Sequence, residues 1–263
     1  MKLIREKILP LLLTIAMVVG VLQGIPVTQV YAASTASVSI GLTDLKDGKY
    51  YTAKTGEDPS YLLVNELDAA PTDGTPYLYY ENDVINVNGN VSLNCTGPST
   101  LTVSGGAITI AGSGSLSLSN SSSSVINMQD QIDSLVLSGN VHFNVNHSGS
   151  APAIYYGTIQ TQEGYSGNIN IHAIYGSALS NMNSVNLETT GDINISNASG
   201  APTIDSYNSV SLTGKTVDLK NTGTGSLVYA RTTASITAME GNFELDGDSA
   251  PTLIAPDGVT LST

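Results

Sequence analysis

Apolar and polar residues alternate in short segments that return along the chain at nearly constant intervals. In the clearest segment two apolar residues flank one polar residue, and a glycine stands shortly before them. Alternate side chains of a β-strand point to opposite faces, so each copy predicts a short strand with one buried face. The glycines are Gly89, Gly114, Gly139, Gly167, Gly191, Gly214 and Gly241, at spacings of 25, 25, 28, 24, 23 and 27 residues. The apolar pairs are Val91 and Leu93, Leu116 and Leu118, Val141 and Phe143, Ile169 and Ile171, Ile193 and Ile195, Val217 and Leu219, and Phe243 and Leu245.

Two further segments complete each repeat. The second segment is shorter, and three of its copies begin with Ala-Pro, which suits the first residue of a strand because proline lacks an N–H donor. Its apolar residues are Val125-Ile126, Ile154, Leu179, Ile204, Leu227 and Leu253. The third segment alternates again, with Ile85 and Val87, Ile108 and Ile110, Leu135 and Leu137, Val185 and Leu187, Val210 and Leu212, and Val259 and Leu261.

A repeat of about 24 residues with three short strands is too small to bury its own apolar face, so it must stack on its neighbours. We therefore predict an all-β fold, a right-handed parallel β-helix of about seven to eight coils with three short strands per coil. An antiparallel sandwich is the alternative. It does not explain why one pattern returns in the same order after each glycine. Cys95, the single cysteine, continues the inward phase of Leu93 and is expected in the core.

The N-terminus has the order of an export signal. Lys2, Arg5 and Lys7 precede an apolar stretch, and small residues follow at Ala32-Ala33. A retained membrane anchor is the alternative, but Pro10 interrupts an apolar run that falls short of the ~20 residues a spanning helix needs. We expect a secreted or cell-surface protein with no membrane contact beyond this segment.

The chain divides into three parts on this pattern. Residues 1–32 are the predicted signal peptide, residues 33–76 an N-terminal cap or irregular segment, and residues 77–263 the β-helix. The repeat continues to Leu261, which leaves open a β-helix truncated at its C-terminus.

Acidic residues dominate the charge. The chain has 9 basic and 22 acidic residues, a net charge of −13. Without the first 32 residues, six basic and 21 acidic residues remain, a net charge near −15. This balance argues against nucleic acid as a partner, because phosphate binding relies on clustered Lys and Arg.

From about Val84 to Thr263 the coil pattern resembles the pectin-lyase-like right-handed β-helix superfamily. More narrowly, it is similar to the Gly/Ser/Thr/Asn-rich solenoids of secreted and surface proteins of Gram-positive bacteria, which are carbohydrate-binding or adhesin-like. The superfamily includes pectate lyases, polygalacturonases, adhesins and non-catalytic glycan binders, so the resemblance implies the fold and leaves the activity open. Lys215, Lys220 and Arg231, the bases of the repeat region, match no catalytic motif of the family.

Stacked carboxylates are the enzymatic candidates. Asp192 and Asp218 fall in or near first strands of adjacent coils, and Glu244 follows Asp218 in the outward column. Successive coils lie ~4.8 Å apart, and carboxylates ~5 Å apart resemble a retaining glycosidase pair. Solvated acidic surface is the alternative interpretation.

No cofactor is predicted, although the binding of Ca²⁺ is a possibility that the sequence leaves open. Asp246, Asp248 and Asp257 lie on expected turns near the C-terminal end, where they could offer the oxygen ligands that Ca²⁺ prefers. The local sequence lacks the EF-hand loop pattern, and the turn aspartates are equally explained as solvated. His142, His147 and His172 show no zinc spacing.

Tyrosines give the strongest functional signal. Tyr155, Tyr156, Tyr207 and Tyr229 are all expected just past the second strand of their coils. A tyrosine ring offers an apolar face and a polar hydroxyl, which suits stacking on sugars. Outward Asn170 and Asn194 could add hydrogen bonds. Structural tyrosines in β-strands are the alternative, since tyrosine has high β-propensity.

We therefore expect a non-catalytic β-solenoid for glycan binding or adhesion, with an extracellular or cell-wall polysaccharide as partner. The alternatives are a polysaccharide lyase or glycoside hydrolase that acts along one solenoid face, and a structural spacer of a longer surface protein.

Overall fold

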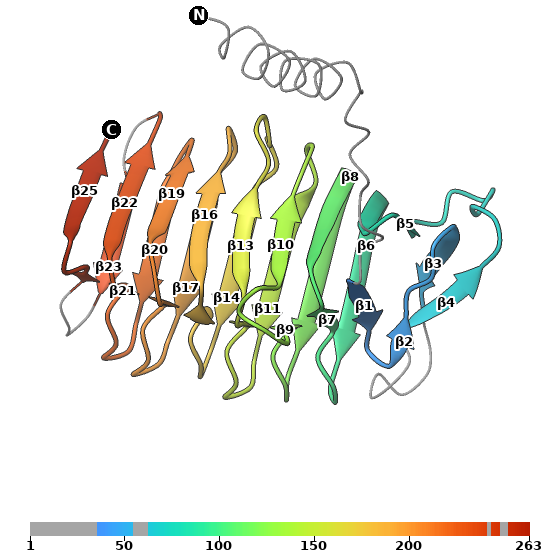
Figure 1. The fold of residues 1–263 in the computed structure, drawn as a ribbon, viewed down its shortest axis with the longest axis horizontal. Helices are drawn as coiled ribbons and strands as arrows, with labels where there is room; N and C mark the ends of the chain where they lie inside the picture. The colour runs from blue at the N-terminus through green and yellow to red at the C-terminus, as the bar shows by residue number, and fades with distance from the viewer. Residues whose placement is uncertain (1–35, 55–62, 241–242, 248–251) are drawn as a thin grey trace, which may run out of the picture. The chain divides into compact units, whose positions relative to one another are not determined.

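The computed structural model describes residues 36–54, 63–240, 243–247 and 252–263, and every regular element among them is a β-strand. Parallel coils of about 25 residues stack into a solenoid of about seven turns. Figure 1 shows this stack from β8 (Ala107–Asn120) to β25 (Gly258–Ser262). The predicted all-β solenoid is confirmed. Residues 1–32, the predicted signal peptide, lie outside the described part, and within that part no helix is long and apolar enough to cross a membrane.

Each coil contributes strands to three faces. Face A is a nine-stranded sheet that contains β1 (Ser37–Ile40), β2 (Thr43–Asp44), β7 (Leu101–Ser104), β9 (Ile126–Met128), β12 (Ile154–Tyr155), β15 (Leu179–Met182), β18 (Ile204–Ser206), β21 (Val228–Ala230) and β24 (Leu253–Ile254). Faces B and C are two branches of a sixteen-stranded sheet. Face B contains β11 (His142–His147), β14 (Ile169–Ala173), β17 (Ile193–Asn197), β20 (Val217–Asn221) and β23 (Phe243–Gly247). Face C contains β10 (Ser134–Leu137), β13 (Thr158–Thr161), β16 (Ser184–Glu188), β19 (Val210–Gly214), β22 (Thr233–Ala238) and β25.

In-register pairing turns the repeat into rows of like residues. On face B, Ile169 stands opposite Ile193, and Ile193 stands opposite Val217. All three are fully buried. Each buried aliphatic side chain contributes about 1.5–3 kcal/mol. The narrow interior is therefore filled by stacked Val, Ile and Leu, which explains how the chain folds with no tryptophan and two phenylalanines.

The structure corrects the register of one coil. The sequence pattern pairs Val141 with Phe143, but Phe143 itself stands opposite the first apolar residue of both neighbouring coils. The alternation Val141-x-Phe143-x-Val145 fits two registers equally, and backbone pairing to both neighbours selects the later one. Asn144, rather than His142, therefore lies in the outward row of Asn170.

An antiparallel cap covers the N-terminal end of the solenoid. β3 (Lys49–Ala53) pairs with β4 (Val64–Leu67) and β5 (Tyr77–Glu81), and β5 pairs antiparallel with β6 (Val84–Cys95). Parallel pairing begins between β6 and β8. Because an open edge of unpaired N–H and C=O groups invites association, this antiparallel layer protects the first coil.

Buried polar residues stand at the end of most face B strands. Asn120, His147, Asn197 and Asn221 occupy equivalent positions in successive coils, and Ala173 interrupts the column between His147 and Asn197. Asn197 Nδ2 donates to the carbonyl oxygen of Ala201 at 3.0 Å. His147 Nδ1 lies 2.8 Å from the Asn120 carbonyl oxygen, and burial lowers the pKa of this imidazole. These side chains satisfy turn carbonyls that would otherwise be buried without donors.

β6 and β8 run unbroken through faces B and C, and glycine makes this possible. Gly114 has φ of +104°, and a Cβ built there would stand 2.2 Å from the Gly89 carbonyl oxygen. Gly112 is similar, with φ of +112° and a Cβ position 2.3 Å from the Val87 carbonyl oxygen. Only glycine accepts both the left-handed backbone and the close approach of the previous coil.

Replacement of Gly114 by alanine is expected to lower the free energy of unfolding by at least about 3 kcal/mol, the sum of left-handed strain and a backbone clash. Gly164→Ala is the matched control, because Gly164 has φ of +80° with no atom within 4 Å of its Cβ position. The control should cost about 1 kcal/mol. Urea denaturation followed by circular dichroism measures both. Equal losses in the two variants would contradict the steric account of this junction.

Candidate functional site

Two of the predicted tyrosines lie in one outward row of face A. Tyr155 in β12 stands opposite Ser180, and Asp205 in β18 stands opposite Tyr229 in β21. Tyr155 and Tyr229 are three coil steps apart, roughly 14 Å. Tyr229 is 39% exposed and Tyr155 is partly buried. Between them the pairing of β15 with β18 shifts register, since Leu179 stands opposite Ile204 and Met182 stands opposite Ser206. The two rings therefore lie on the same sheet, with polar residues and this irregularity between them.

Tyr156 and Tyr207 each follow directly on the end of a face A strand. The ring centroids of Tyr155 and Tyr156 are 4.3 Å apart, in an edge-to-face arrangement. The hydrogen bond that the Tyr156 hydroxyl donates to Tyr155 is the largest cause that raises the pKa of Tyr156, and the nearby Tyr155, Tyr207 and Asp130 raise it further. The backbone of Tyr156 is left-handed, with φ of +64°. Tyr155 and Tyr156 therefore form a ring pair at the end of β12, and Tyr207 follows β18 two coils further along.

Arg231 lies beside Tyr207 and Asp205 stands opposite Tyr229, and the sequence pattern does not single out either residue as a site residue. The Arg231 guanidinium carbon lies 4.1 Å from the centroid of the Tyr207 ring, a cation–π contact. Burial raises the pKa of Asp205, and the charge of Arg231 partly offsets this rise. Both residues could have been found from the sequence if the pairing register of the face A strands had been known. Asp205 lies in the row of Tyr155 and Tyr229, and Arg231 follows β21 as Tyr207 follows β18.

Asn170 and Asn194 lie on face B, away from the face A tyrosines. Their amides form a ladder with Asn144: Asn194 Nδ2 donates to Asn170 Oδ1, and Asn170 Nδ2 donates to Asn144 Oδ1, each at 2.8 Å. Much of their hydrogen-bonding capacity is therefore used between coils. The structure does not bring these asparagines together with the tyrosines.

The carboxylates of face B continue the asparagine row. Asp218 stands opposite Asn194, and Glu244 stands opposite Asp218, as the column of the repeat predicts. Asp218 Oδ1 is buried without a hydrogen-bond partner among the described residues. Burial, with a smaller contribution from the Glu244 charge, raises the pKa of Asp218. Asp192 lies outside this row and accepts a 2.7 Å hydrogen bond from the Thr216 hydroxyl.

The proposed calcium ligands do not gather in the part of the chain that the structure covers. Asp246 Oδ2 accepts a 2.6 Å hydrogen bond from Lys220 Nζ, which holds the pKa of Lys220 above its ordinary value. Asp257 lies in the turn before β25, and Asp248 lies outside the described residues. Among the described residues no group of three His, Cys, Asp or Glu side chains is placed to hold a metal ion.

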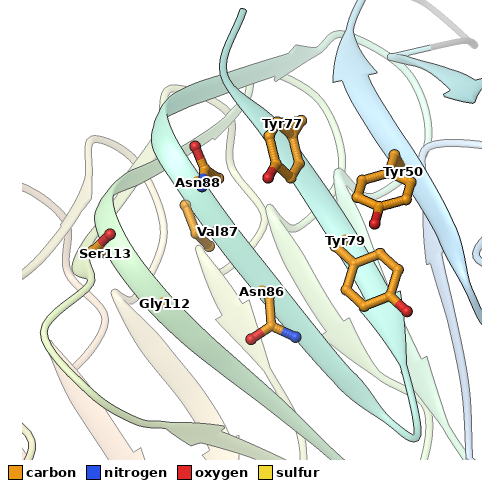
Figure 2. A pocket seen from close by; sticks show the side chains of 8 residues that line it. All are labelled: Tyr50, Tyr77, Tyr79, Asn86, Val87, Asn88, Gly112 and Ser113. Atoms are coloured by element: carbon orange, nitrogen blue, oxygen red, sulfur yellow. The ribbon is translucent and has the colours of Figure 1, made fainter. Parts of the chain in front are cut away.

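A second group of tyrosines lies at the cap and is absent from the predicted site residues. Tyr50 in β3 stands opposite Tyr79 in β5, and Tyr79 stands opposite Asn86 in β6. The Tyr50 ring centroid is 4.6 Å from that of Tyr79 and 5.5 Å from that of Tyr77. The three rings border an open pocket of about 310 Å³ (Figure 2). The signal in the sequence was the alternation Tyr77-Leu78-Tyr79, which points both tyrosines to one side.

Compared with known proteins, the chain has no match among protein-family models, curated proteins or solved structures. Membership of the pectin-lyase-like superfamily stays a prediction from the coil pattern.

Asp218→Asn is expected to raise the free energy of unfolding at pH 7 by about 1 kcal/mol, because an amide would donate to Asn194 Oδ1 and remove a buried unpaired oxygen. The folded chain binds a proton at Asp218 more readily than the unfolded chain, since the pKa is raised. The gain should therefore shrink as the pH falls through that raised pKa, where the wild-type carboxyl becomes neutral. Denaturation curves at several pH values measure this.

Asp192→Asn is the matched control, because its carboxylate already has the Thr216 hydroxyl as a donor. It should leave stability unchanged or lower it. A stabilisation equal to that of the Asp218 variant would contradict the assignment of the unpaired oxygen.

Proposed function

We propose that the chain is a non-catalytic, secreted or cell-surface β-solenoid that binds polysaccharide through the tyrosines of face A. The observation that carries the proposal is the placement of Tyr155 and Tyr229 in strands of face A, with Tyr156 and Tyr207 directly after the strands β12 and β18 of the same sheet. Aromatic rings on a rigid strand face lose little conformational freedom when a ligand stacks on them. The pectin-lyase-like superfamily is the proposed family.

The polar groups beside the rings suit a hydroxyl-rich ligand. Asp205 stands opposite Tyr229 and can accept hydrogen bonds. Arg231 lies over the Tyr207 ring and can donate them. Ligand sites of this kind combine apolar faces with a few placed polar groups. A row about 14 Å long, from Tyr155 to Tyr229, can engage several units of a glycan rather than one.

The proposed compartment follows from the N-terminal pattern. Lys2, Arg5 and Lys7, the apolar stretch and Ala32-Ala33 support export, after which a polysaccharide of the cell wall or surroundings would be within reach.

A second candidate is a polysaccharide hydrolase, which the Asp218–Glu244 pair favours. The two residues are in register on adjacent coils, and the raised pKa of Asp218 is the property that a general acid requires. A polysaccharide lyase would instead need a basic residue that removes a proton, and Lys220 is engaged by Asp246 in an ion pair.

The combined change of Tyr155, Tyr207 and Tyr229 to alanine tests the binding proposal, because these rings span four successive coils of face A. Retention of the purified protein on a panel of insoluble polysaccharides is measured by depletion from solution. The triple variant should lose at least about tenfold in affinity, equal to about 1.4 kcal/mol, since the stacking surfaces are gone.

Tyr175→Ala is the control, because Tyr175 is 67% exposed and lies in the turn before β15. It should bind like the wild type, and circular dichroism should show all variants folded. Equal retention by the triple variant and the control would contradict the proposal. If the protein releases reducing ends from a polysaccharide and the Asp218→Asn variant does not, the hydrolase function replaces the binding proposal. If the protein is retained on no polysaccharide, the structural spacer is favoured.

A further inference from the structure

The pocket at the cap has an aromatic side and a polar side. The polar side continues from the tyrosines across the sheet, because Tyr77 stands opposite Asn88, and Asn88 stands opposite Ser113. Figure 2 shows the rings on the cap strands and the amide and hydroxyl groups on the next two strands. The six side chains are those of Tyr50, Tyr77, Tyr79, Asn86, Asn88 and Ser113.

The aromatic side is held rigid by the rings themselves. Tyr50 packs against Tyr79 at an interplanar angle of 33° and against the edge of Tyr77 at 66°. Tyr77 and Tyr79 lie two residues apart on one strand, roughly 7 Å. Rings fixed by such contacts present a stacking surface with little entropy left to lose.

The amides of the pocket are available, unlike those of face B. Asn170 and Asn194 spend their side-chain groups on each other. The structure gives the side chains of Asn86 and Asn88 no hydrogen bond within its described residues, and Asn88 is exposed. Each free amide offers two donors and an acceptor in the direction of the pocket.

The lining excludes several ligand classes. No charged side chain belongs to it within the described residues. A phosphate or uronate would therefore meet no cation. Glu81, whose carboxylate accepts a hydrogen bond from the Tyr79 hydroxyl and so raises the pKa of Tyr79, would repel such a ligand. A purely apolar ligand would leave the amides without partners. The volume of about 310 Å³ is at the lower end for ligand pockets, which suits one or two small rings.

We propose that this pocket is a second carbohydrate site, which binds a neutral pyranose unit of a soluble or terminal glycan. The sugar ring stacks on Tyr77 or Tyr79, and its hydroxyls bond to Asn86, Asn88 and Ser113. The site belongs to the cap and is separate from the face A tyrosines, so it does not depend on the polysaccharide binding proposed for that face.

Soluble trisaccharides test the site. Isothermal titration and saturation-transfer NMR are run with cellotriose, xylotriose, mannotriose and maltotriose, and with trigalacturonate as the charged comparison. At least one neutral trisaccharide should bind at millimolar concentration or below. Tyr77→Ala and Asn88→Ala should each weaken that binding about tenfold or more, because one removes a stacking ring and the other a free amide.

The controls separate this site from face A and from general damage. Tyr77→Phe keeps the ring and should retain binding within about threefold. Tyr175→Ala and the triple variant of face A should bind the trisaccharide like the wild type. The inference is overturned if no neutral trisaccharide binds, if binding is indifferent to both Tyr77→Ala and Asn88→Ala in folded protein, or if trigalacturonate binds the pocket more tightly. Loss of trisaccharide binding in the face A variant alone would likewise overturn it, whereas the polysaccharide proposal would stand.

Discussion

Backbone pairing between successive coils is the interaction on which the rest of the structure depends. Each coil places its strands in register with those of the coils before and after it, so that almost every strand finds donors and acceptors on both sides. No coil can bury its apolar residues alone. A fixed register therefore decides at once which side chains fill the interior and which form rows on the outside.

The rows differ in how many of their polar groups already have hydrogen-bond partners within the protein. Inside, Asn197 and Asn221 bond to turn carbonyls and are structural. Outside on face B, the amides of Asn170 and Asn194 bond to each other, so that row is mostly satisfied until it reaches Asp218. The tyrosines of face A and of the cap are the exceptions, since partly exposed rings stand beside polar groups. For this reason we propose that the tyrosines bind glycan and that the asparagine ladder stabilises the stack of coils.

The period of the repeat was enough to predict the solenoid, because one alternating pattern recurred at seven glycines in the same order. The period did not determine which residue of one strand pairs with which residue of the next. The pattern predicts Leu227 as the second-segment residue, but Val228 is the residue that stands opposite Ile204, since two adjacent apolar residues give the same pattern. Face C strands with a weak pattern, such as Ala234-x-Ile236, were likewise not recognised although both residues are buried.

The candidate site could be predicted only where it follows the repeat. Tyr155 and Tyr229 share a row because their coils are alike. The cap tyrosines come together through antiparallel pairing of β3, β5 and β6, which no repeat governs, and the pairing of Tyr50 with Tyr79 joins residues far apart in sequence. Arg231 and Asp205 could be recognised only from the pairing register of the face A strands, which the sequence pattern does not determine.

The most direct test of tyrosine-mediated binding is NMR of the protein with ¹³C-labelled tyrosine rings, titrated with fragments of whichever polysaccharide retains it. The account predicts that ring signals of the two tyrosine groups shift while those of buried Tyr51 and Tyr165 and of exposed Tyr175 stay in place. Unchanged signals from both groups under saturating glycan would contradict it. The signals expected to move are those of Tyr155, Tyr156, Tyr207 and Tyr229 on face A, and of Tyr50, Tyr77 and Tyr79 at the cap.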